Sequence, residues 1–184
     1  MLPLKDCKIT SPYGVERTIN GVKSVHKGID LISVSGDREV KSISDGVVRG
    51  NFNDPNGFGN YVSIEHADGK RVIYAHLASF KKKPGDKVQA GDVIGIEGNT
   101  GKSTGIHLHL EVRDTPYMQR NHIDVTKYLG IENKVGLVKE KELTKEEQKE
   151  IIKKKVGLDD NSIQYLEFYK YGNDLIRKLA NALK

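Results

Sequence analysis

Residues 60–75 read NYVSIEHADGKRVIYA, and this stretch decides the fold of the first part of the chain. Two runs rich in β-branched and aromatic residues flank the dipeptide Asp68-Gly69, whose members both tolerate a positive φ. Such runs around such a dipeptide predict a β-hairpin. Three more runs of similar composition, separated by turns rich in glycine, cover residues 44–50, 93–96 and 106–112. The first 130 residues therefore predict a mostly antiparallel β domain.

A different pattern begins near residue 144. Thr144 and Glu147 have the spacing of a capping box, which marks the start of a helix, and Asp159 or Asp160 can cap a second one. Apolar residues then recur at helical spacing in three segments, namely Ile151, Ile152 and Val156, then Ile163, Leu166 and Tyr169, then Leu175, Ile176, Leu179 and Leu183. We therefore expect an α+β chain with a β-rich domain at 1–130, a linker at 131–143 and a small three-helix domain at 144–184.

The composition excludes several classes of protein. The 184 residues include 30 Lys+Arg and 25 Asp+Glu, so the formal net charge is only +5. No apolar run approaches the roughly 18 residues of a membrane span, and the first residues lack the apolar segment of a secretory signal. Cys7 is the only cysteine, which rules out a disulfide framework and an all-cysteine zinc site. Mixed charges such as Glu150 and Lys154 are typical of a solvated helix and not of a nucleic-acid-binding arm.

Histidines and carboxylates must therefore carry the chemistry, and His107 and His109 stand two residues apart in a predicted strand. Residues i and i+2 of a strand project from the same face, so both imidazoles would point to one side. Beside the glycine-rich stretch 98–105, they suit a metal site that takes one more ligand from elsewhere. The alternative is a chance pair on a solvated strand face.

His26 and Asp30 form a second candidate, in a segment that contains Gly28. The glycine favours a loop or the start of a strand, and a loop can bring both side chains to one cation. Imidazole and carboxylate are ordinary zinc ligands, and three protein ligands with an open water position describe a catalytic zinc site. The alternative is a surface loop with an exposed salt bridge.

The remaining histidines have different settings. His76 ends an apolar run in the sequence Tyr-Ala-His-Leu, and by itself it predicts a satisfied histidine of a core or an edge. His66 precedes the Asp68-Gly69 turn and is expected to be structural. His122 lies in a polar stretch and is expected to be exposed.

In chain order, the motifs H-x3-D, Y-x-H-L and G-x-H-L-H-x-E resemble those of the lysostaphin-type zinc metallopeptidases, which cut peptide bonds in bacterial peptidoglycan. The resemblance covers roughly residues 10–125 and leaves the C-terminal segment unmatched. It extends to Ser11-Pro-Tyr-Gly14, to Gly59-Asn-Tyr-Val62 with Ile64-Glu-His66, and to the stretch 85–95.

The resemblance implies one zinc ion per chain, held by His26, Asp30 and His109, and a catalytic pair of His76 and His107. His107 would then be the general base, because it shares a strand face with a ligand. His76 would donate to the developing oxyanion or orient the attacking water.

The implied function is a zinc endopeptidase that lyses the cell wall, with peptidoglycan as its partner. Without a secretory signal, we expect a phage-type endolysin that is made in the cytoplasm and released by lysis, or one carried on a virion. One feature departs from the family pattern. Several members have a tyrosine shortly before the first zinc histidine, and none occurs between Thr18 and Val25.

Three other functions fit less well. A phosphate-binding P-loop ending at Gly101-Lys-Ser103 would need glycine where Ile96 stands. The stretch 85–95 is similar to carrier-protein hairpins, but no motif for a modified lysine accompanies it. A cell-wall-binding or regulatory module with a structural zinc site would have a fourth protein ligand, and the two additional histidines argue against it.

The predicted helical domain has three open roles. It could target the wall, self-associate through Leu175, Leu179 and Leu183, or pack as a small bundle on the peptidase. Its aromatic residues could stack on sugars or fill the bundle core, and they are Tyr165, Phe168, Tyr169 and Tyr171.

Overall fold

The computed structural model describes residues 1–19, 21–114, 121–138, 144–168 and 172–183. The chain divides into two compact units, Met1–Glu140 and Lys141–Lys184. We call them the sheet unit and the helical unit. None of the helices in the described part of the chain is long and apolar enough to cross a membrane.

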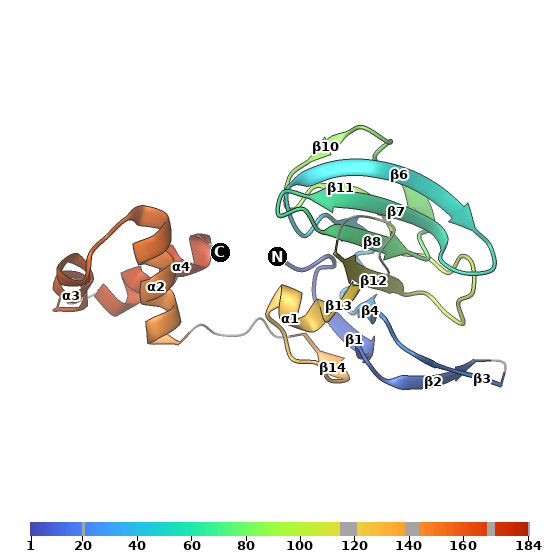
Figure 1. The fold of residues 1–184 in the computed structure, drawn as a ribbon, viewed down its shortest axis with the longest axis horizontal. Helices are drawn as coiled ribbons and strands as arrows, with labels where there is room; N and C mark the ends of the chain where they lie inside the picture. The colour runs from blue at the N-terminus through green and yellow to red at the C-terminus, as the bar shows by residue number, and fades with distance from the viewer. Residues whose placement is uncertain (20, 115–120, 139–143, 169–171, 184) are drawn as a thin grey trace. The chain divides into compact units, whose positions relative to one another are not determined.

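A nine-stranded sheet forms most of the sheet unit (Figure 1). Its strands follow the order β10-β6-β7-β8-β12-β4-β1-β14, with β13 paired to β12, and the paired strands are antiparallel. These strands are β1 (Cys7–Ser11), β4 (Ile29–Ser33), β6 (Gly46–Asp54), β7 (Gly59–His66), β8 (Arg71–Ala75), β10 (Lys87–Val88), β12 (Leu108–Arg113), β13 (His122–Ile123) and β14 (Gly136–Leu137).

The predicted hairpin is confirmed, and its register separates the two faces of the sheet. Val62 pairs with Tyr74 across β7 and β8, and Tyr74 pairs with Leu110 on β12. All three side chains are buried in the hydrophobic core. Because side chains alternate along a strand, the neighbours His109 and Glu111 project from the opposite face. The candidate metal site therefore lies on the face that the core does not use.

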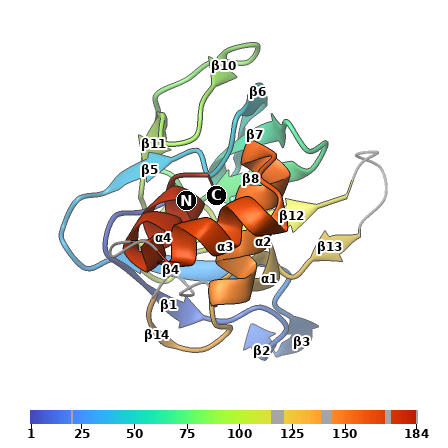
Figure 2. The same ribbon diagram turned by 90° about the vertical axis from the view of Figure 1, so that its left-hand side faces the viewer.

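Two smaller sheets and one helix complete the sheet unit. A three-stranded sheet has the order β5-β11-β9, and the ribbon of β2 and β3 projects away from the large sheet (Figures 1 and 2). The helix α1 begins after Asp124, whose side chain accepts hydrogen bonds from the next turn, and it ends at Gly130 in a left-handed conformation. The bounds are β2 (Glu16–Ile19), β3 (Val22–Val25), β5 (Glu39–Lys41), β9 (Ser79–Phe80), β11 (Val93–Ile96) and α1 (Val125–Leu129).

The first half of the predicted linker 131–143 belongs instead to the sheet unit. Ile131 and Val138 pack against the hydrophobic core, and β14 pairs with β1, where Lys8 faces Leu137. These apolar side chains bury surface that a linker would leave in water. The second half of the predicted linker, 139–143, lies outside the described residues.

The predicted three helices of the helical unit are confirmed as α2 (Lys145–Val156), α3 (Asp160–Phe168) and α4 (Gly172–Ala182), and they lie together in Figure 2. The capping box of Thr144 and Glu147 is formed. The predicted apolar face of α4 is wrong at Leu175, which is 42% exposed. The core instead consists of Ile152, Ile163, Ile176 and Ala180, because Ile176 and Ala180 are one turn apart and share a face. Tyr169 lies outside the described residues.

Candidate metal and catalytic centre

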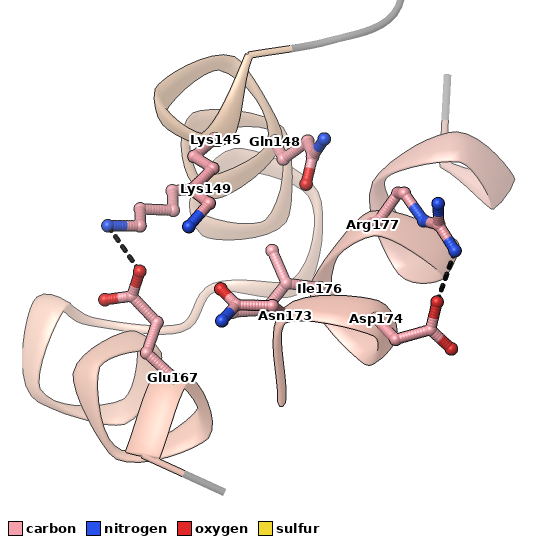
Figure 3. Close-up of a pocket in the computed structure, with 8 residues that line it drawn as sticks. All are labelled: Lys145, Gln148, Lys149, Glu167, Asn173, Asp174, Ile176 and Arg177. Carbon is pink, nitrogen blue, oxygen red and sulfur yellow. Dashed lines mark hydrogen bonds and ion pairs between the residues drawn. The ribbon is translucent and has the colours of Figure 1, made fainter. Parts of the chain in front are cut away.

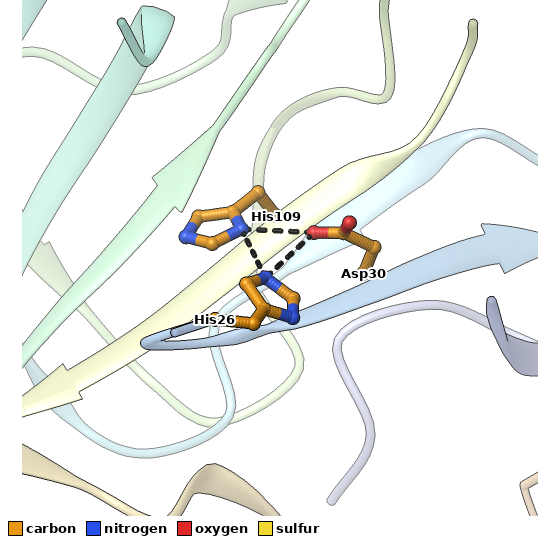
Figure 4. Close-up of side chains that lie close together, drawn as sticks. All are labelled: His26, Asp30 and His109. Carbon is orange, nitrogen blue, oxygen red and sulfur yellow. Dashed lines mark hydrogen bonds and ion pairs between the residues drawn. The ribbon is translucent and has the colours of Figure 1, made fainter. Parts of the chain in front are cut away.

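His26, Asp30 and His109 lie close together on the face of the large sheet opposite the hydrophobic core (Figure 4). His26 follows β3, Asp30 lies in β4, and His109 is directly opposite Asp30 on β12. His109 Nδ1 lies 2.8 Å from Asp30 Oδ1, and His26 Nε2 lies 3.2 Å from the same oxygen. All three residues are buried. Strand pairing therefore joins candidate ligands that are far apart in the sequence.

Gly28 allows this close approach. A Cβ atom at this position would lie 2.4 Å from the carbonyl oxygen of Leu110 and 2.9 Å from His109 Nε2. A side chain here would push the His26–Asp30 segment away from β12. The glycine therefore has a packing reason as well as the local one that the sequence indicated.

Two contacts orient the ligand atoms. The carbonyl oxygen of Pro12 lies 2.8 Å from His26 Nδ1 and can only accept, so that nitrogen carries the proton and Nε2 presents a lone pair. Arg17 Nη2 lies 2.5 Å from Asp30 Oδ2 and leaves Oδ1 for the cluster. The same Arg17 nitrogen lies 2.7 Å from His26 Nδ1, which is not a hydrogen bond once both atoms carry protons. Sequence reasoning missed Arg17, since nothing local connects β2 to Asp30.

The ligand atoms fit a zinc ion. Burial alone would raise the pKa of the Asp30 carboxyl, but the adjacent rings of His109 and His26 outweigh it and hold that pKa well below its usual range. Two ring nitrogens and one carboxylate oxygen lie within 4.8 Å of one another, close enough to bind one cation. Two imidazoles, one carboxylate and a free position are the donor set of a catalytic zinc site.

Glu111 supports His109 from behind. Its Oε1 lies 3.5 Å from His109 Nε2, and Arg113 Nη2 lies 2.5 Å from its Oε2. Ligand histidines commonly direct their second nitrogen to a carboxylate. His122 also faces Glu111, at 3.5 Å, and only 12% of its side chain is exposed. The prediction that His122 is exposed is therefore wrong, because β13 places it against β12.

His76 and His107 lie beside the cluster, with their ring centroids 4.6 Å apart. His107 Nε2 lies 3.9 Å from Asp30 Oδ1, and the His76 ring centroid lies 5.9 Å from that of His109. The structure thus brings together all five residues that the sequence singled out. It does not add His66, which is buried between the hydroxyls of Tyr74 and Tyr128, consistent with the expected structural role.

Backbone carbonyls fix the proton on each of these two rings. His76 Nδ1 lies 2.8 Å from the carbonyl oxygen of Thr100, and His107 Nδ1 lies 2.9 Å from that of Gly105. Since a carbonyl can only accept, both Nδ1 atoms carry the proton and both Nε2 atoms present lone pairs. Burial lowers the pKa of His76 to about 4, so its ring is neutral at pH 7. The two rings are therefore arranged to accept hydrogen bonds or protons.

The helical unit holds a hollow of a different kind (Figure 3). It has a volume of about 340 Å³ and lies among α2, α3 and α4. Lys149 pairs with Glu167 at 2.7 Å, and Arg177 pairs with Asp174. Ile176 is the one apolar residue of its lining, and the others include Lys145, Gln148 and Asn173. Within the described residues, His26, Asp30 and His109 form the one group able to hold a metal ion, so this hollow is not a metal site.

Comparisons with known proteins agree with the geometry. The profile of Peptidase family M23 matches residues 24–125. The DD-carboxypeptidase/endopeptidase Mpg of Neisseria meningitidis serogroup B is 41% identical over 112 residues, which are 60% of this chain and 25% of Mpg. The glycyl-glycine endopeptidase ALE-1 of Staphylococcus capitis is 41% identical over 88 residues, which are 47% of this chain and 24% of ALE-1. This chain thus spans about a quarter of the length of these relatives.

A solved structure matches more completely. The catalytic domain of lysostaphin from Staphylococcus simulans is 32% identical, with a TM-score of 0.59, over 66% of this chain and 90% of that domain. The matched family segment contains the three-residue cluster and both neighbouring histidines. The chain therefore belongs to peptidase family M23.

Proposed function

We propose that this chain is a zinc-dependent endopeptidase that hydrolyses peptide bonds of bacterial peptidoglycan. The observation that carries the proposal is the convergence of five side chains. The ligating atoms of His26, Asp30 and His109 lie within 4.8 Å of one another, and the rings of His76 and His107 lie beside them with their Nδ1 atoms held by backbone carbonyls. A structural zinc site would use a fourth protein ligand in place of this arrangement.

His26, Asp30 and His109 would hold the zinc ion, which polarises a scissile carbonyl and lowers the pKa of water toward about 7. His107 then acts as general base, because its Nε2 lies near Asp30 Oδ1 and is free to take a proton. It returns that proton to the leaving amine.

Of the two roles predicted for His76, the structure supports the orientation of water. A donor to the oxyanion needs a proton on Nε2, but the carbonyl of Thr100 keeps the proton on Nδ1. The neutral ring therefore presents an acceptor, which can hold the attacking water in line with the carbonyl. This assignment leaves charge stabilisation in the transition state to the zinc ion.

The names of the relatives support a cell-wall peptide as substrate. ShyA of Vibrio cholerae, a peptidoglycan DD-endopeptidase, is 39% identical over 107 residues, which are 57% of this chain and 24% of ShyA. Mpg is also named for DD-bonds, whereas ALE-1 is named for glycyl-glycine bonds. The substrates of a test should therefore include both D-alanyl and glycyl cross-links.

For the helical unit we propose targeting to the wall, which would raise the effective concentration of the enzyme at its substrate. Tyr165 supports this role, since it is 77% exposed and lines a shallow hollow with Leu158 and Leu166. Self-association has less support, because Leu179 and Leu183 pack against the unit's own core. The side chain of Phe168 lies outside the described residues, as do Tyr169 and Tyr171. A phage-type origin and release by lysis stay predictions.

Mass spectrometry of fragments released from purified sacculi tests the proposed function. Sacculi with several types of cross-link are incubated with the enzyme, with a zinc chelator, and with the chelator followed by added zinc. We expect new amino termini that vanish with the chelator and return with zinc. Absence of release, with zinc shown to be bound, would instead indicate a wall-binding or regulatory module. Release of reducing sugar ends would mean that the enzyme cleaves glycosidic bonds and that the proposed peptide hydrolysis is wrong.

A further inference from the structure

Three hydrogen bonds of Thr100 connect the glycine-rich loop 98–105 to His76, Leu77 and Asn60. Its carbonyl oxygen accepts from His76 Nδ1 at 2.8 Å. Its hydroxyl donates to the carbonyl oxygen of Leu77 and accepts from the backbone N–H of Asn60, both at 2.9 Å. The hydroxyl thus ties the loop to the residue after His76 and to the start of β7.

The backbone of His76 needs such support. His76 has a φ of +62°, in the left-handed region that non-glycine residues rarely adopt. Its backbone N–H donates to the carbonyl oxygen of Phe58, and that of Leu77 donates to Asn60, both at 2.9 Å. A conformation of this kind persists when surrounding contacts over-determine it. Thr100 adds two contacts to these hydrogen bonds, one to the His76 ring and one to the backbone of Leu77.

The loop lies directly against β7, with no side chain between the two backbones. A Cβ atom on Gly59 would lie 2.3 Å from the carbonyl carbon of Thr100, and one on Gly101 would lie 2.2 Å from the nitrogen of Gly59. Because glycine lies on both sides of this contact, the hydrogen bonds of the Thr100 hydroxyl determine the position of the loop against β7. The position of the loop in turn determines where the Thr100 carbonyl, and with it the His76 ring, lies.

We propose that the hydroxyl of Thr100 is a positioning group for His76, which seats the loop so that the Thr100 carbonyl holds the proton on Nδ1 and directs Nε2 toward the reacting centre. The catalytic consequence rests on the proposed function, in which His76 orients the attacking water. The structural consequence does not, because the tautomer of the His76 ring can be observed without turnover.

Two substitutions isolate the hydroxyl. Thr100→Val keeps the shape of the side chain and removes both hydrogen bonds, whereas Thr100→Ser keeps the hydroxyl. We expect Thr100→Val to lower kcat about 100-fold on a soluble cross-linked peptide, because a small displacement of a catalytic group is enough for that loss. KM should change by less than about twofold, and the zinc content should stay at one per chain. Thr100→Ser should stay within about threefold of wild type.

Thr126 provides a matched control. It is buried, and its hydroxyl donates to Asp124 Oδ1 at 2.6 Å at the start of α1. Thr126→Val therefore removes a buried hydroxyl of the same unit outside the catalytic centre. We expect a lower Tm and an unchanged kcat. If Thr126→Val and Thr100→Val lower kcat equally, the role of Thr100 is only structural and the proposal is wrong.

The nitrogen chemical shifts of the His76 ring give the second measurement. In the wild-type protein we expect the Nδ1–H tautomer, and in Thr100→Val a mixture of the two tautomers with zinc still bound. Where the valine variant fails to fold, Thr100→Ala removes the same hydroxyl without placing a methyl group against Leu77 and Asn60. Wild-type shifts and kcat in the folded variant would overturn the proposal. A wild-type enzyme that cleaves no wall peptide would refute the proposed function, while the shifts would still decide the positioning role.

Discussion

The sheet unit and the helical unit build their cores in opposite ways. In the sheet unit, contacts join distant parts of the chain, and the hydrogen-bonded pair Asp30 and His109 is separated by 79 residues. In the helical unit, three consecutive helices enclose a core of four buried residues, from Ile152 to Ala180. A metal site needs side chains fixed from several directions, and the unit with long-range strand pairing provides them. The helical unit has local contacts, a small core and no histidine.

The largest expected effect concerns the metal in the sheet unit. His109→Ala removes a ligand atom, so we expect loss of bound zinc and a decrease in turnover of at least about 10³-fold, since the metal supplies several kcal/mol of charge stabilisation. Elemental analysis and a soluble peptide assay measure both. The unfolding transition of the helical unit should not move. An alanine variant that retains zinc would show that His109 is not a ligand.

A second change tests whether the small core stands alone. Ile152→Ala should destabilise the helical unit by about 2–5 kcal/mol, enough to unfold a core with four buried residues. Zinc content and turnover of a soluble peptide should stay at wild-type values. Val156→Ala, on the same helix but half exposed, is the matched control and should cost less than about 0.5 kcal/mol. If Ile152→Ala lowers turnover of the soluble peptide, the two units are energetically coupled.

Lowering the pH should destabilise the sheet unit more than the helical unit. Burial lowers the pKa of His66 to about 4 from the value of 6.5 expected in the unfolded chain. The unfolded state therefore binds the proton first, and the contribution of His66 to the stability of the sheet unit is lost as the pH drops from about 6.5 to 4, at most about 3 kcal/mol. Above pH 6.5 this contribution is fully present.

Denaturation curves between pH 7 and 4 measure this effect. His66→Gln carries no titrating group there, so its curve should be flatter than that of the wild type, while loss of zinc affects both proteins alike. The helical unit should show no comparable loss, because it has no histidine. Equal slopes for the wild type and His66→Gln would show that His66 does not cause the pH dependence.

The smallest effect concerns the start of α2. The hydroxyl of Thr144 accepts from the backbone of Glu147 at 3.2 Å, and the Glu147 carboxylate accepts from the backbone of Thr144 at 2.9 Å. Thr144→Ala should lower the stability of the helical unit by about 1 kcal/mol. Thr144→Ser, which keeps the oxygen, should lose much less, and chemical denaturation compares the two. Equal losses would assign the effect to packing of the methyl group and not to the cap.

Local patterns predicted much of the fold. The β7–β8 hairpin follows from alternating apolar residues around Asp68-Gly69, and the start of α2 follows from its capping box. The pattern was insufficient at Leu175, because a helical face of this width does not decide which residue meets the other helices. The two-residue strand β14 has no periodicity of its own, so its pairing with β1 could not be predicted.

The five residues of the centre could be named from their motifs, but not the residues that hold them. Arg17 reaches Asp30 from β2, and Thr100 reaches His76 from a loop 24 residues away. Such contacts depend on how distant segments pack, and no spacing in the sequence encodes them. Glu111 stood within the quoted motif, yet its support of His109 requires the strand geometry. His122 was misjudged for the same reason.

Zinc content and turnover of His107→Ala, measured on one preparation, test most directly the division of the centre into three ligands and a catalytic pair. We expect the variant to keep one zinc ion per chain and to lose at least about 100-fold in kcat, the usual contribution of a general base. Near-wild-type turnover with zinc bound would contradict the general-base role of His107. Loss of the metal would contradict the division itself, because His107 would then be a ligand.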